Sequence, residues 1–139
     1  MRELGNGLSV AKRDVEASSV KEAELAMRRR LGSSERSLLD VQGNLSITYQ
    51  ALGRFEEASR IQRDVYSGHV KLNGEEHIET LGVGSNYASS LVVLKRFEEA
   101  KAVLRKVMPV ARRVLGESHG LTLRMRVIYT DALYRDPAA

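Results

Sequence analysis

The sequence predicts an all-α fold, an α-solenoid in which antiparallel helix pairs stack side by side. The first observation is a repeat: the segment RFEEA at residues 54–58 returns at residues 96–100, a spacing of 42 residues, and the same spacing relates Gly32, Gly74 and Gly116. The second is that apolar residues between these glycines recur every three or four positions, the period of an amphipathic helix. A fixed period of this length is typical of units that bury their apolar faces only against their neighbours.

Six helices are expected from this pattern, at about residues 9–30, 36–52, 55–71, 78–94, 97–114 and 121–134. The expected division of the chain is an N-terminal helix within residues 1–30, which can be half of a preceding repeat, then units 31–72 and 73–114. Residues 115–139 hold either the first helix of a third unit or a C-terminal capping helix, an alternative that the sequence leaves open.

Two prolines mark expected helix ends. Pro109 lacks a backbone N–H and clashes with the preceding turn, which predicts a kink or an early helix end near Met108. The last helix should end at Asp136, because a residue that precedes proline is pushed away from helical geometry. His77 and His119 recur at the repeat spacing in the joints between units, which favours a structural role for both.

The helical period also predicts which side chains lie inside. One apolar stripe of the first unit is Leu38, Val41, Leu45, Tyr49 and Leu52, opposed by Ala58, Ile61, Val65 and His69. Small residues are expected where helices cross closely, at Ser46, Ala58, Ala88 and Ala100. Gly82 and Gly84, inside a predicted helix, are interpreted as further points of close packing.

The order of these residues resembles a known family. Large, small and aromatic residues (Leu45, Ser46, Tyr49), a turn glycine (Gly53), then Phe55 and Ala58 resemble the tetratricopeptide repeat (TPR). The second unit follows with Tyr87, Ala88, Leu91, Phe97, Ala100 and Leu104. Its period is longer than the usual TPR period of about 34 residues, and with its long joints it looks like the kinesin light chain type. The resemblance implies a right-handed superhelical fragment. Two residues depart from the pattern: Lys95 stands where the first unit has its turn glycine, and Gln62 stands where the second unit has the apolar Leu104.

The same resemblance implies a concave groove lined by the first helix of each pair. The expected groove residues are Asn44, Ile47 and Gln50 in the first unit, Asn86, Ser89 and Val93 in the second, and Arg124, Asp131 and Arg135 in the third, with Asp40, Gly43, Gly82, Ser85, Val127 and Ile128 beside them. Asn44 and Asn86 match the position at which many TPRs hold a ligand backbone, and an amide offers both a donor and an acceptor. Two alternatives stay open. Either asparagine can serve only to bond a neighbouring hairpin, and the arginines can be solvated without binding a ligand.

Composition excludes several functions. The net charge of +4 suits an acidic partner but is too small to imply nucleic acid. The chain has three histidines, no two of which share a helical face at ligand spacing, and no cysteine, so no metal site is expected. Neither a catalytic motif nor a cofactor-binding motif is present, so we expect no enzyme and no cofactor. With no apolar segment long enough for a membrane span, we expect a cytoplasmic protein.

The leading hypothesis is a protein-protein interaction module that binds a peptide segment of a partner in the concave groove. The alternative is a structural solenoid segment that self-associates, or stacks as a homo-oligomer, through its open ends. A third hypothesis, RNA binding, depends on the arginine clusters at residues 28–30 and 112–113, and the scarcity of aromatic residues disfavours it.

Overall fold

The computed structural model describes residues 7–30 and 34–137, and the side chains of residues 14–27 and 34–137. The described residues form six helices and no strand. They are α1 (Gly7–Arg30), α2 (Glu35–Ala51), α3 (Phe55–Asn73), α4 (Ile78–Val93), α5 (Phe97–Leu115) and α6 (Gly120–Arg135). All six predicted helices are therefore present, with ends within about two residues of those expected. None of these helices is long and apolar enough to cross a bilayer.

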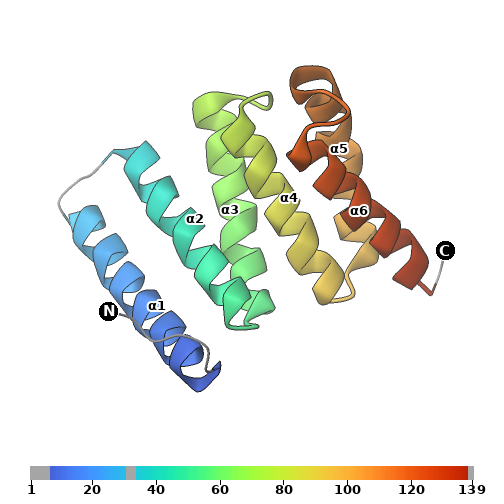
Figure 1. The fold of residues 1–139 in the computed structure, drawn as a ribbon. Coiled ribbons are helices and arrows are strands. Elements are labelled where there is room, and N and C mark those ends of the chain that lie inside the picture. Colours follow the sequence, from blue (N-terminus) through green and yellow to red (C-terminus); the bar gives the residue numbers. More distant parts are fainter. Residues whose placement is uncertain (1–6, 31–33, 138–139) are drawn as a thin grey trace.

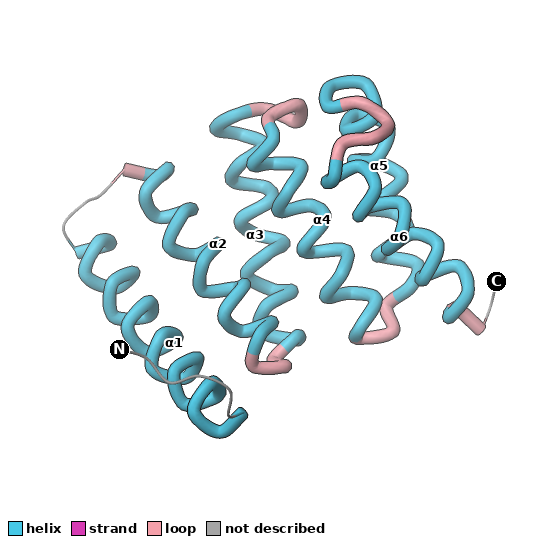
Figure 2. Tube along the Cα trace, in the orientation of Figure 1, coloured by secondary structure: helices cyan, strands magenta, loops and turns pink. Residues whose placement is uncertain are grey.

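The helices form a curved row of pairs (Figure 1). Along this row α2 contacts α4 and α4 contacts α6, whereas the described residues of α3 and α5 do not contact one another. The row therefore bends toward the layer formed by α2, α4 and α6. Figure 2 shows the tight turns within pairs along the lower edge of the row and the longer joints between pairs along its upper edge. The first helix, α1, packs against α2.

The two joint histidines cap the helices that follow them. Nδ1 of His77 accepts a hydrogen bond from the backbone N–H of Glu79 at 3.1 Å, and Nδ1 of His119 accepts one from Leu121 at 3.1 Å. Each ring thereby satisfies one of the unpaired N–H groups at a helix start. The predicted structural role of both histidines is confirmed.

The two turns within pairs share one backbone conformation. Gly53 has φ +79° and Lys95, its counterpart one repeat later, has φ +64°. In each turn the backbone N–H of the next residue donates to the carbonyl five residues earlier. Arg54 donates to Tyr49 and Arg96 donates to Leu91, both at 2.8 Å. Lys95 thus adopts a left-handed conformation that costs little only for glycine.

The apolar core consists of clusters at the interfaces between neighbouring helices. The largest cluster joins α4, α5 and α6 and contains Leu81, Ala88, Leu104, Val107, Met108, Ala111 and Met125. A smaller one joins α2 and α3 through Leu45, Tyr49 and Ala58. The four small residues predicted at helix crossings, Ser46, Ala58, Ala88 and Ala100, are all at most 2% exposed. Their predicted burial is confirmed.

Glycine packing agrees with the prediction at one position and not at the other. A Cβ at Gly84 would lie 3.1 Å from Val107, so this glycine does allow a close approach of α5. At Gly82 a Cβ would meet nothing within 4 Å, so the close-packing interpretation is wrong there. Among the glycines between residues 34 and 137, the most closely packed is Gly68, which the period did not single out: its Cβ would lie 2.6 Å from Leu39 on α2.

The predicted early end of the fifth helix near Met108 is wrong, because α5 continues through Pro109 to Leu115. The side chains of Met108 and Ala111 on either side of the proline are buried, whereas Pro109 itself is exposed. Because proline has no N–H, the carbonyl four residues earlier lacks its helical donor. On the solvent side of the helix that carbonyl can bond water, while burial of the apolar side chains on the other side stabilises the helix. The last helix ends at Arg135 with Asp136 as its C-cap, directly before Pro137 as predicted.

Candidate functional site

The layer formed by α2, α4 and α6 lies on the concave side of the row. It contains a hollow of about 240 Å³ between α2 and α4, and α3 forms the floor of this hollow. Its lining residues are Leu39, Asp40, Gly43, Asn44, Ser46, Ile47, Gln62, His69, Glu79, Gly82, Val83 and Asn86. The structure therefore brings together three of the principal groove residues, Asn44, Ile47 and Asn86, from two successive units. Ile47 is 50% exposed and gives the hollow an apolar contact surface.

The two asparagines present free amides to this hollow. Asn44 is exposed and Asn86 is half-buried. Within the part of the chain that the structure describes, neither side-chain amide has a hydrogen-bond partner, and only their backbone carbonyls accept bonds, from Thr48 and Gln50. Among the described residues, no hydrogen bond therefore supports the alternative that these amides only bond a neighbouring hairpin.

A third amide lies in the floor of the hollow. Gln62, which occupies the repeat position of Leu104, is only 1% exposed. Its Oε1 accepts a hydrogen bond from the hydroxyl of Ser90 at 2.8 Å, while its Nε2 is buried without a partner. A buried donor without an acceptor is costly. The sequence marked this position only as a departure from the apolar pattern.

Gln50, Ser85, Ser89 and Val93, also expected in the groove, lie outside the hollow, whereas Asp40, Gly43 and Gly82 line it. Gln50 donates from Nε2 to the hydroxyl of Ser90 at 2.7 Å and to the carbonyl of Asn86 at 3.2 Å, so it connects α2 to α4. Ser89 is half-buried, Val93 is 43% exposed, and Ser85 is fully buried.

The residues expected from the third unit do not join them. Val127, Ile128 and Asp131 line a separate hollow of about 660 Å³ along α6. Arg135 lies 3.4 Å from Asp131 and stacks at 6.0 Å over the ring of Phe97. Arg124 is exposed and lies outside both hollows.

Arg135 also borders a third hollow, of about 710 Å³, between the α4–α5 turn and the end of α6. Beside it the buried Lys101 donates from Nζ to Asp136 at 2.9 Å and approaches Glu98 at 2.9 Å. These two carboxylates, Asp136 first, raise the pKa of Lys101. Because these charges pair with one another, we interpret them as a contact that holds the residue after α6 against α5.

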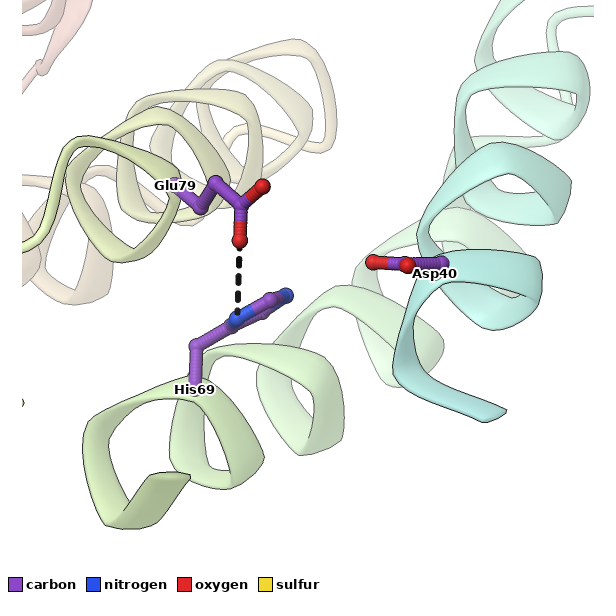
Figure 3. A group of neighbouring side chains, drawn as sticks. All are labelled: Asp40, His69 and Glu79. Atoms are coloured by element: carbon purple, nitrogen blue, oxygen red, sulfur yellow. Dashed lines mark ion pairs between the residues drawn. The ribbon is translucent and has the colours of Figure 1, made fainter. Parts of the chain in front are cut away.

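One end of the hollow between α2 and α4 is acidic. Asp40, His69 and Glu79 come from three different helices, and one ligand atom of each lies within 4.8 Å of the other two (Figure 3). This group was not predicted, because its three members lie far apart in the sequence. One signal in the sequence could have pointed to it: the repeat counterpart of the buried His69 is Ala111.

Comparison with known proteins identifies the repeats. The tetratricopeptide repeat model matches residues 38–79 and 80–120, which is more than half of the chain. No curated protein matches the chain.

Two solved structures share the fold. The crystal structure of the kinesin light chain nearly identical TPR-like repeats of Podosopora anserina aligns with a TM-score of 0.78 and 25% identity, over 88% of this chain and 62% of that one. BtubC (BKLC) from P. vanneervenii aligns with a TM-score of 0.68 and 17% identity, over 91% of this chain and 57% of that one. The chain therefore spans about three fifths of the length of these structures.

The family is a class of non-enzymatic scaffolds that bind proteins. The period, the stacked helix pairs and the two matched units agree with one another. The chain belongs to the tetratricopeptide repeat family and is a TPR solenoid of the kinesin light chain-like type.

Proposed function

We propose that this protein-interaction module holds a peptide segment of its partner in the concave groove, with the backbone of the peptide bound by Asn44 and Asn86. The observation that carries the proposal is the hollow between α2 and α4, which collects three amide side chains with unused hydrogen-bonding groups. An extended peptide offers a carbonyl and an N–H at every residue, which is what such amides can bind.

The size of the hollow limits what enters it. At about 240 Å³ it is smaller than the pockets that hold drug-sized molecules. It suits one side chain or a short stretch of backbone, with Ile47 providing apolar contact. A carbonyl or hydroxyl oxygen of the peptide that reaches the floor would accept from Nε2 of Gln62, which the folded chain leaves without a partner.

The charge of the partner follows from the distribution of charges along the groove. The net charge of +4 favours a partner with acidic residues. The hollow itself carries the carboxylates of Asp40 and Glu79, so acidic side chains of the partner should contact the groove beyond it, toward the exposed Arg124 on α6. Nucleic acid is a poor fit to a groove with these carboxylates.

The test begins with an immobilised peptide array, from which the peptide with the strongest signal is taken into solution. Fluorescence anisotropy then gives its dissociation constant for the native protein and for the double variant Asn44→Ala and Asn86→Ala. Two lost hydrogen bonds of about 1 kcal/mol each predict binding weaker by about tenfold or more. Ser67→Ala, an exposed change on α3, is the matched control and should bind like the native protein. Unchanged affinity of the double variant, with helicity intact by circular dichroism, would rule the mechanism out.

The second candidate is self-association along α6. Leu123, Val127 and Tyr134 border the hollow on this helix, and Val127 is 67% and Tyr134 86% exposed. A second copy of the chain packing there would cover this apolar surface. Sedimentation velocity over a concentration series tests it: Val127→Lys should lower the mass of any oligomer, and a monomer at all concentrations would remove the candidate.

A further inference from the structure

The acidic end of the hollow combines one imidazole with two carboxylates. Asp40 lies on α2, His69 on α3 and Glu79 in the first turn of α4. Figure 3 shows the carboxylate of Glu79 above the ring of His69 and that of Asp40 to one side of the ring. Nδ1 of His69 lies 4.0 Å from Oε1 of Glu79, and all three ligand atoms lie within 4.8 Å of one another.

We propose that Asp40, His69 and Glu79 bind a divalent transition-metal ion, Zn²⁺ in the first instance, that links these three helices. One nitrogen and two oxygen ligands suit zinc, which binds histidine at about 2.0–2.1 Å and carboxylates at about 2.0–2.2 Å. With three protein ligands the ion keeps a position open for water, and the hollow provides room for it.

The site needs only a small adjustment to close around an ion. Ligand atoms of a tetrahedral zinc ion are about 3.3 Å apart, so no pair has to approach by more than about 1.5 Å. His69 is 4% exposed, and its Nδ1 accepts a hydrogen bond from the side-chain amide of Asn73 at 3.0 Å; the ring gives up this bond when Nδ1 binds the ion. Asp40 and Glu79 are exposed and can move toward it.

The neighbouring charges are consistent with this role. Glu79 has a long ion pair with Arg36 at 3.7 Å, and the described residues include no partner for Asp40. Arg36 also donates to Asn73 at 2.7 Å, so it can keep that bond when Glu79 turns to the ion.

The next joint of the same chain shows that the fold does not require these residues. One repeat later the counterparts of Asp40, His69 and Glu79 are Gly82, Ala111 and Leu121. Of these, Ala111 and Leu121 pack in the apolar cluster of α4, α5 and α6, and none of the three is a metal-ligating residue type. A buried histidine with two facing carboxylates is therefore specific to the first joint, as expected of a binding site.

Isothermal titration with zinc chloride tests the proposal on the intact chain. We expect one ion per chain, a rise in melting temperature at saturating zinc, and little effect of Mg²⁺, which prefers all-oxygen sites. Asp40→Ala and Glu79→Ala, both exposed positions, should each weaken zinc binding by about tenfold or more. Glu75→Ala, a carboxylate of the same joint outside the cluster, should leave it unchanged.

The exposed joint histidines are the main competing ligands, and two controls separate them from His69. His77→Asn retains a residue that can cap α4 and should bind zinc like the native protein. In an imidazole ¹⁵N spectrum, which resolves three histidines, zinc should shift the signals of His69 first. Absence of zinc binding, or binding that survives Asp40→Ala and Glu79→Ala but is lost in His77→Asn, would overturn the proposal.

Discussion

Gln50 and Ser90 join two successive repeats: Nε2 of Gln50 on α2 lies 2.7 Å from the hydroxyl of Ser90 on α4. Ser90 is fully buried and donates in turn to Oε1 of Gln62 on α3 at 2.8 Å. Three helices thus share one chain of polar contacts within an otherwise apolar interface. Because solenoid units are stabilised only by their neighbours, such contacts contribute directly to coupling between repeats.

Ser90→Ala should destabilise the fold by about 1–3 kcal/mol, because it leaves the buried Oε1 of Gln62 without a donor. In a Gln62→Leu background the same change should cost clearly less, since that acceptor is absent. Urea unfolding of the native protein, both single variants and the double variant gives the coupling free energy. An equal cost of Ser90→Ala in both backgrounds would show that the chain of contacts is not a stabilising unit.

Lys95→Gly should raise the free energy of unfolding by about 1 kcal/mol. Lys95 holds φ +64°, a conformation in which a side chain is strained, and its counterpart Gly53 holds φ +79° with a glycine. The reciprocal change Gly53→Ala should lower stability by a similar amount. Thermal and urea unfolding measure both. A less stable Lys95→Gly variant would mean that the lysine side chain contributes more than its strain costs.

Gly68→Ala and Gly82→Ala should change stability in opposite directions. A methyl group at Gly68 would approach Leu39, which is 6% exposed, to 2.6 Å, so we expect a loss of about 1–3 kcal/mol. At Gly82 the methyl group meets nothing within 4 Å, and a helical alanine should gain about 0.4–1 kcal/mol. Urea unfolding of the two variants tests the pair, and equal effects would contradict it.

Stability should fall in alkali, in part through Tyr49. A hydrogen bond from the Tyr49 hydroxyl to Glu22, followed by burial, raises the pKa of Tyr49 above its ordinary value of 10.0. The folded state then holds this proton more tightly than the unfolded state. Its contribution is therefore complete below the unfolded pKa and is lost as pH rises through the folded pKa.

Tyr49→Phe should accordingly make the loss of unfolding free energy above about pH 10 less steep. Part of the loss will remain, because burial also raises the pKa of Tyr66 and Tyr87. The matched control is Tyr134→Phe, which removes the same hydroxyl at a position that is 86% exposed. Urea midpoints at a series of pH values measure the slopes, and identical slopes for the native protein and Tyr49→Phe would refute the assignment.

The sequence alone determined the helices, their order and the family. A repeat in register shows which positions are equivalent, and the helical period shows which of them are buried, so Ala58 and Ala100 could be placed in the core without coordinates. Helix formation and burial of this kind depend on neighbours in the chain and on one repeating interface. The period also showed that Asn44 and Asn86 are equivalent, while their expected place in the groove came from the resemblance to the TPR family.

Only the tertiary structure decided which side chains from different helices meet. Pro109 remains inside α5 because one side of the helix is buried and the other is open to water. Gln62 is accommodated in an apolar position because Ser90 of the next unit reaches its Oε1. The group of Asp40, His69 and Glu79 exists because three helices cross at one joint. Contacts between side chains far apart in sequence depend on the distances and angles between packed helices, and a periodic pattern does not contain them.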